Sequence, residues 1–301
     1  GYEIFSGVNV PSKAFGEFVE HKYGTPRLPA EEIKAKLDAG ENIVILDSRP
    51  MKEFTSMSIP GGICCPGAEL AYRISDAVDD PQTLVVVNCA GRTRSIIGAQ
   101  SLINAGIPNP VVALENGTMG WHLAGYGLDH GQVRRAPNVT KNGLERSRKM
   151  ADTVAKRFGV EKVSSADLER FRTQTSEITL FVLDVRSPEE YIAGHLPGSR
   201  SAPGGQLVQA TDEYVGVRHA RLILVDDTGV RATMTASWLI QMGWDNVYVL
   251  DGGLTQSGLE VGPEQREVLG LGNLDVQLVE ASVLNELITQ ENAVVIDLAD
   301  S

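Results

Sequence analysis

The chain repeats itself, and this internal repeat restricts its fold more than any other feature. When the sequence is shifted by 137 residues, so that residue 43 falls on residue 180, IVILDSRPMKEF overlays LFVLDVRSPEEY. The matched pairs include Asp47 with Asp184, Arg49 with Arg186, Glu53 with Glu190, Pro60 with Pro197 and Arg94 with Arg231. Agreement at this many positions in one register predicts two copies of one domain.

Each copy alternates apolar strands with helical segments. In the first copy, continuous apolar runs at 43–46, 84–87 and 111–114 are separated by segments with helical patterns, among them 30–40 and 95–104. Strands of a parallel sheet are buried on both faces and therefore read as continuous apolar runs. The pattern predicts an α/β fold in which each copy is a parallel sheet with helices on both faces.

Composition excludes several classes of protein. At 301 residues the chain is long enough for two domains, and its 42% hydrophobic and 22% charged residues describe a globular protein. The net charge of −12 argues against nucleic acid as a partner, because phosphate binding needs a basic surface. No apolar run approaches the roughly 18 residues of a membrane span. Three cysteines and an N-terminus without signal-peptide character predict a cytoplasmic, reducing location.

The repeat also predicts the domain boundaries, with copies at 28–129 and 161–262. Residues 1–27 are expected to be a lead-in. Segment 130–160 is expected to be a basic, partly helical linker. His130–Gly159 contains eight Lys and Arg but only two acidic residues. We interpret its charges as solvated or docked on the acidic domains, with partner binding as the alternative. Residues 280–297 track 30–47 without a gap, so we expect 263–301 to hold a linker and the start of a further, truncated copy of a longer array.

Chemistry concentrates in the stretch 84–95, LVVVNCAGRTRS. Cys89 follows a buried strand and precedes a helix, whose N-terminal partial charge and free N–H groups favour a thiolate. Arg92 and Arg94 add full positive charges, and Gly91 lets the backbone bend into a nest of N–H groups that binds anions. The alternative, a small packed apolar residue, fits this position poorly, so Cys89 is predicted to be a nucleophile.

These motifs together resemble the rhodanese superfamily. The resemblance rests on Asp47-x-Arg49 after the first long strand, the Gly-His-Leu-Pro-Gly turn at 194–198, the cysteine loop ending in Arg-Ser, and Asn-Gly-x-x-x-Trp at 116–121. NCAGRTRSIIG is especially similar to bacterial proteins with several rhodanese domains in one chain. The resemblance implies a five-stranded parallel sheet in each domain.

The resemblance also implies a sulfurtransferase. Such an enzyme moves a sulfane sulfur from a donor such as thiosulfate to cyanide or a thiol, through a persulfide on Cys89, with neither cofactor nor metal. The expected partners are a small-molecule donor and acceptor, with a thiol protein as a further candidate acceptor. The persulfide-binding loop would comprise Ala90, Gly91, Arg92, Thr93, Arg94 and Ser95. Asp47 and Arg49 would be structural, and Arg73 either reaches the pocket or is an exposed helical arginine.

The second copy is predicted to lack activity. Asp226 falls at the position of Cys89, and a carboxylate neither forms a persulfide nor attracts an anionic donor. In the family, an inactive domain is often paired with an active one whose site it buttresses. Here the active copy would come first in the chain.

Two other functions are weighed against sulfur transfer. Rhodanese-related phosphatases have a histidine before the cysteine and a loop one residue longer, whereas Asn88 precedes Cys89 here and four residues separate Cys89 from Arg94. A non-enzymatic scaffold or sulfur-carrier partner fits the second copy, but the intact loop of the first copy argues against it. Cys64 and Cys65 are interpreted as packed loop residues, with a resolving thiol as the alternative.

Overall fold

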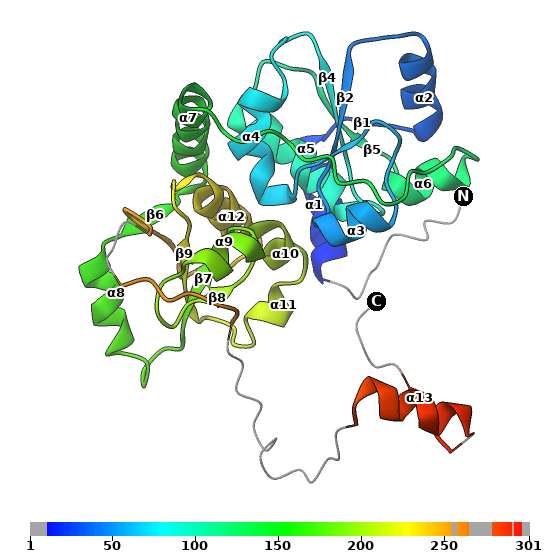
Figure 1. The fold of residues 1–301 in the computed structure, drawn as a ribbon. Helices are drawn as coiled ribbons and strands as arrows, with labels where there is room; N and C mark the ends of the chain where they lie inside the picture. Colours follow the sequence, from blue (N-terminus) through cyan, green and yellow to red (C-terminus); the bar gives the residue numbers. More distant parts are fainter. Residues whose placement is uncertain (1–10, 255–257, 265–278, 291, 297–301) are drawn as a thin grey trace. The chain divides into compact units, whose positions relative to one another are not determined.

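The computed structural model describes residues 11–254, 258–264, 279–290 and 292–296. The chain divides into two units, residues 1–264 and 265–301. The first unit contains both predicted copies, each built around its own sheet (Figure 1).

The first sheet has five strands, all paired in parallel. Its order is β1-β5-β4-β2-β3, which places β4, the strand before the cysteine loop, at the centre. The strands are β1 (Arg27–Leu28), β2 (Ile43–Asp47), β3 (Ile63–Cys64), β4 (Leu84–Asn88) and β5 (Val111–Leu114). The predicted five-stranded parallel sheet is confirmed.

Helices cover both faces of this sheet because side chains alternate along the strands. Val85 and Val87 pack with residues of α4 (Leu70–Ala77) and α5 (Thr93–Ala105). Val86 points the other way and packs with α2 (Ala30–Asp38) and α6 (Gly117–Leu123). The short helices α3 (Met51–Ser56) and η1 (Gly67–Glu69) complete the copy.

The second sheet repeats this arrangement, with the order β6-β10-β9-β7-β8. The strands are β6 (Glu161–Val163), β7 (Leu180–Asp184), β8 (Arg200–Ser201), β9 (Arg221–Val225) and β10 (Val247–Leu250). The helices are α8 (Ser165–Arg172), α9 (Pro188–Ala193), α10 (Gly204–Gln209), α11 (Thr211–Tyr214) and α12 (Val230–Gln241). The same strand order in both sheets confirms at the level of the fold what the internal repeat predicted.

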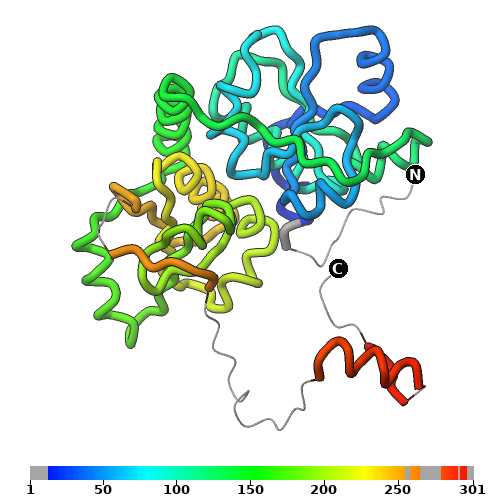
Figure 2. Tube along the Cα trace, in the orientation of Figure 1, coloured from blue at the N-terminus to red at the C-terminus, as the bar shows by residue number. Residues whose placement is uncertain are grey.

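Each copy is preceded by a helix that leads into its first strand. The helix α1 (Pro11–Tyr23) packs on α5, and α7 (Lys141–Phe158) packs on both α12 and α4. The chain passes from the first sheet to the second through α7 (Figure 2). The segments expected to be a lead-in and a linker thus each contribute a helix. The helix α1 packs on α5, which follows the Cys89 loop, and α7 packs on α12, which follows the Asp226 loop.

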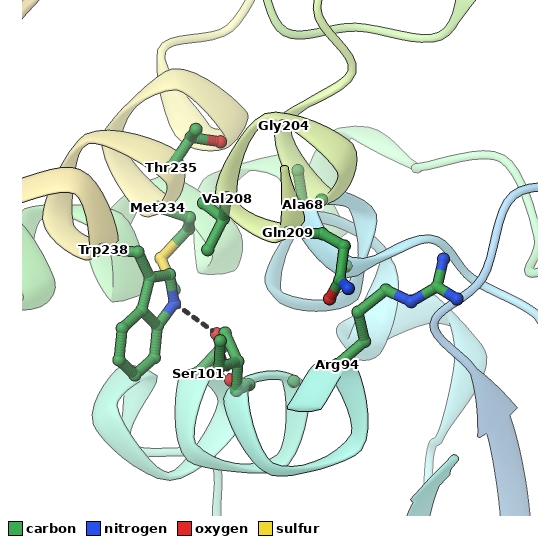
Figure 3. A pocket seen from close by; sticks show the side chains of 13 residues that line it. Ala68, Arg94, Ser101, Gly204, Val208, Gln209, Met234, Thr235 and Trp238 are labelled. Carbon is green, nitrogen blue, oxygen red and sulfur yellow. Dashed lines mark hydrogen bonds between the residues drawn. The ribbon is translucent and has the colours of Figure 1, made fainter. Parts of the chain in front are cut away.

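The two copies are in direct contact. The indole Nε1 of Trp238 on α12 donates to Ser101 Oγ on α5 at 2.8 Å. The backbones approach closely at Gly67 and Gly205, where a Cβ on Gly67 would lie 3.3 Å from the Gly205 Cα. A pocket of about 30 Å³, room for about one water molecule, lies between the copies beside Arg94 (Figure 3).

The second unit is described through α13 (Ala281–Thr289), a helix where the sequence predicts one. Residues 292–296 form no strand, and the rest of the expected third-copy strand, Asp297, lies outside the described residues, so the third copy stays a prediction. Over the ranges that the structure describes, no helix combines the length and apolarity needed to cross a membrane.

Candidate active site

Cys89 is the first residue after the central strand of the first sheet. The strand β4 ends at Asn88 and α5 begins at Thr93, so the loop lies at the carboxyl edge of the sheet, where α/β folds place ligands. The thiol is buried, with 2% of the residue exposed. Ser95, in the first turn of α5, donates from Oγ to the Cys89 Sγ at 3.1 Å. The structure thus brings the two ends of the predicted loop together.

The first turn of α6 donates hydrogen bonds to the backbone of the Cys89 loop. The Cys89 carbonyl accepts hydrogen bonds from Thr118 N at 2.7 Å and Thr118 Oγ1 at 3.0 Å, and Met119 N donates to the Ala90 carbonyl at 3.0 Å. Gly117 makes this approach feasible. Its φ is 56°, and a Cβ there would lie 2.3 Å from the Cys89 carbonyl oxygen.

Gly117 was not among the predicted site residues. In the sequence, the stretch 116–121 contributes only to the family resemblance. The repeat carries a signal for Gly117, because at the offset of 136 residues that aligns β5 with β10 it falls on Gly253. Gly253 also has a positive φ, and a Cβ there would lie 2.0 Å from the Asp226 carbonyl oxygen.

A buried polar cluster fixes the ends of the neighbouring strands. The guanidinium of Arg49 forms a paired contact with the Asp47 carboxylate, at 2.9 and 2.7 Å, and donates to the Met57 carbonyl at 2.7 Å. Asn88 Nδ2 donates to both Asp47 Oδ2 and Thr118 Oγ1 at 3.0 Å. These bonds connect β2, β4 and α6 directly beside Cys89.

Acidic residues hold both arginines of the loop. Arg92 donates to Glu20 of α1 at 2.6 Å and lies 3.5 Å from Glu17. Arg94 donates to both carboxylate oxygens of Glu53, at 2.7 and 2.8 Å, and to Gln206 Oε1 of the second copy at 3.0 Å. The positive charges that the sequence assigned to donor binding are therefore partly balanced by these carboxylates.

The remaining predicted residues have simpler surroundings. Ala90 and Gly91 form the partly exposed turn of the loop, and Thr93 starts α5, with Gly16 of α1 packed against it. Arg73, on α4, donates to Glu69 at 2.6 Å and to the Pro137 carbonyl at 2.8 Å.

The other two thiols have a different environment. Burial, followed by the charge of Asp47, raises the pKa of Cys64 to about 12, and its Sγ donates to the Arg49 carbonyl at 3.5 Å. Burial also raises the pKa of Cys65 well above its ordinary value. Both side chains are therefore protonated near neutral pH, which makes them poor nucleophiles.

In the second copy, a carboxylate occupies the place of the thiol. Asp226 is buried and accepts hydrogen bonds from Gly229 N at 2.7 Å, Arg231 N at 3.1 Å and Thr228 Oγ1 at 3.0 Å. Burial raises the pKa of this carboxyl, although the positive charge of Arg231 opposes the effect. The second loop thus directs its backbone N–H groups at a side chain of its own.

Arg231, the equivalent of Arg94, is fully buried within a group of acids. It donates to Glu190 at 2.8 and 2.9 Å, to Asp227 at 2.7 Å, and across to Glu69 of the first copy at 2.7 Å. Burial works to raise the pKa of Glu190, but the hydrogen bonds and charge of Arg231 outweigh it and lower that pKa to about 2. Throughout the described part of the chain, no three His, Cys, Asp or Glu side chains are grouped to hold a metal ion.

The fold and the site define an α/β protein with two matching parallel sheets, one loop bearing a thiol and one loop filled by a carboxylate. The family model described as Rhodanese-like domain matches residues 29–124 and again residues 166–257. The chain belongs to the rhodanese family.

Relatives with known names support this assignment. The solved structure of a thiosulfate sulfurtransferase from Pseudomonas aeruginosa is 53% identical, with a TM-score of 0.83 over 94% of this chain and 53% of its own. The thiosulfate sulfurtransferase GlpE of Pseudoalteromonas translucida is 32% identical over 25% of this chain and 69% of its own length. The HTH-type transcriptional regulator Rv0324 of Mycobacterium tuberculosis is 32% identical over 33% of this chain. The chain spans about half the length of the solved relative and 43% of the regulator.

Proposed function

We propose that this chain is a sulfurtransferase that carries a sulfane sulfur as a persulfide on Cys89. The observation that carries the proposal is the placement of the Cys89 thiol at the end of β4, against Ser95 and at the mouth of α5. The relatives named for thiosulfate make that anion the first donor to test.

In the first half of the reaction, the Cys89 thiolate attacks the outer sulfur of thiosulfate. The S–S bond of the donor breaks, sulfite leaves with the electron pair, and the sulfur stays on Cys89 as a persulfide. The N-terminal N–H groups of α5 and the Ser95 hydroxyl offset the negative charge of the sulfur.

In the second half, an acceptor attacks the terminal sulfur of the persulfide. Cyanide gives thiocyanate, a thiolate gives a new persulfide, and Cys89 leaves as the thiolate. No cofactor is needed, because the two-electron chemistry takes place at sulfur. The contacts of Asp226 support this scheme, since two backbone N–H groups of the second loop donate to the oxygens of a carboxyl group in the matching position.

The proposal is tested by the formation of thiocyanate from thiosulfate and cyanide. We expect Cys89→Ser to lower the turnover by more than about 10³-fold, because a hydroxyl cannot carry the sulfur. Cys64→Ser is the matched control, since serine can still donate to the Arg49 carbonyl. If Cys89→Ser kept the activity of the unaltered chain, the assigned nucleophile would be wrong.

Mass spectrometry of thiosulfate-treated protein gives an independent readout. The peptide carrying Cys89 should gain about 32 Da, the mass of one sulfur atom, and lose it on addition of cyanide. The peptide carrying Cys64 and Cys65 should stay unmodified. An adduct confined to that second peptide would contradict the proposal.

A further inference from the structure

The two loop arginines occupy matching positions but have unequal partners. Arg231 meets Glu190 of its own copy and Glu69 of the other copy. Under the 137-residue shift, Glu190 corresponds to Glu53 and Glu69 to Gln206. Glu53 and Gln206 are the partners of Arg94. The same arrangement of three side chains therefore occurs twice. The partner from the other copy is the carboxylate of Glu69 in one case and the amide of Gln206 in the other.

This difference changes the charge around the loops. Arg231 accompanies four carboxylates: those of Glu69, Glu190 and Asp227 accept its hydrogen bonds, and that of Asp226 lies 3.9 Å from its Nε. Ala90 stands at the position equivalent to Asp227, and Arg94 meets one carboxylate, that of Glu53, together with the neutral amide of Gln206. The active loop is thus much less negative than the filled loop.

The charge around Arg94 acts on the reacting sulfur. Arg94 precedes Ser95, whose hydroxyl contacts the Cys89 Sγ. Burial works to lower the pKa of Arg94, but its bonds to Glu53 and the nearby charge of Cys89 raise it overall. Arg94 and the thiol are therefore electrostatically coupled, and a charge added beside Arg94 would be felt by an anion approaching Cys89.

We propose that Gln206, which the second copy supplies, is a specificity-determining residue for the site of the first copy. As a neutral partner it fixes the Arg94 guanidinium by a hydrogen bond without cancelling its charge. The loop then accepts a doubly charged sulfane donor such as thiosulfate. This inference rests on the proposed function.

The test is Gln206→Glu. This variant places a carboxylate beside Arg94, as Glu69 places one beside Arg231. We expect kcat/KM for thiosulfate to fall about tenfold through a higher KM, with kcat kept within about twofold. For benzenethiosulfonate, a donor with one negative charge, the fall should be about threefold, because the repulsion scales with the charge of the donor. Both effects should shrink at about 1 M salt.

Two variants separate charge from shape. Gln206→Met removes the hydrogen bond without adding charge and should keep kcat/KM within about threefold of the unaltered chain. Gln174→Glu adds the same charge beside another arginine, since Gln174 Oε1 accepts from Arg221 at 3.2 Å at the start of β9, the end of that strand away from its loop. It should leave both donors unaffected.

The outcomes distinguish this inference from the proposed function. Equal losses for both donors, or equal losses in Gln206→Met and Gln206→Glu, would show that Gln206 is merely structural and would overturn the inference. An unaltered chain that turns over neither donor and forms no persulfide would instead refute the proposed function.

Discussion

Cys89 and Asp226 present different groups from the same place in two copies of one fold. The carboxylate receives backbone N–H groups of its own loop, whereas the thiol contacts Ser95. The N–H groups that would bind an external anion in the second loop already donate to Asp226. The predicted inactivity of the second copy therefore has a geometric reason in addition to the missing thiol.

Gly117 allows a test at the scale of one residue. We expect Gly117→Ala to destabilise the chain by more than about 3 kcal/mol and to lower any sulfurtransferase activity more than about tenfold, because the added Cβ would collide with the Cys89 and Gly91 carbonyls. Thermal unfolding and thiocyanate formation measure the two effects.

The control for this prediction is Gly125→Ala. Gly125 also has a positive φ, but a Cβ there meets nothing within 4 Å, so only the backbone strain of about 1 kcal/mol applies. Similar losses in both variants would show that contact with the loop is not what requires Gly117.

The sequence predicted the position of Cys89 but not the partners of the arginines beside it. Cys89 lies between a strand and a helix that both have clear patterns. The contact of Arg92 with Glu20 spans 72 residues, and that of Arg94 with Gln206 spans 112. Such contacts depend on how helices pack, which no local spacing encodes.

At the scale of elements, the highly charged helix α7 buries one narrow face against both copies. Its buried residues, Gly143, Ser147, Ala151 and Val154, recur every three to four positions and form a narrow stripe. The rest of the helix is polar, with Lys156 and Arg157 in the last turn, where the helix dipole favours positive charge. The basic residues of the linker thus lie partly on this polar side of α7, where Arg146 and Arg148 donate to the Ser75 and Thr228 carbonyls of the two copies.

Val154 is the residue of α7 on which its packing can be tested. It is fully buried against Ala71, Ala105 and Met234, which come from both copies. Val154→Ala should lower the free energy of unfolding by about 2 kcal/mol, because the removed methyl groups leave a cavity. Lys156→Ala, an exposed change on the same helix, should stay within about 0.5 kcal/mol. Urea denaturation of both variants would decide, and equal effects would contradict the assigned packing.

The longer helices and strands could be predicted because each contains enough residues to show a helical periodicity or a continuous apolar run. The strands β2, β4 and β5 appear as apolar runs, and the predicted helix at 95–104 is shorter than α5 by two residues at its start and one at its end. The strands β1 and β3 have two residues each and carry no periodicity. They are the two edge strands of the sheet, where β1 pairs with β5 and β3 with β2.

At the scale of the whole molecule, the copies are joined by charge as well as by apolar packing. Arg231 binds Glu190 in its own copy and Glu69 in the other, so breaking this cluster affects both copies. Removing one member of a buried ion pair typically costs about 3–5 kcal/mol, since the other charge is left without a partner.

The acid side of the stability profile should show this cluster. The pKa of Glu190 is lowered from 4.5 to about 2, so its contribution to stability is present above about pH 4.5 and is lost as the pH falls towards 2. The difference in unfolding free energy between the unaltered chain and Glu190→Gln should therefore shrink over this range. The same comparison with Glu189→Gln, an exposed neighbour, should change less, and a Glu190 difference independent of pH would contradict the assignment.

The crossed partners of the two arginines also bear on how the sequence can evolve. Duplication ordinarily leaves one copy of a gene free to accumulate substitutions. Asp226 accepts hydrogen bonds from its own loop, so a substitution at that position acts first on the second copy. Arg231 and Gln206 bond to Glu69 and Arg94 of the first copy. If the first copy carries out the proposed chemistry, selection on that chemistry also restrains substitution at these two positions of the second copy.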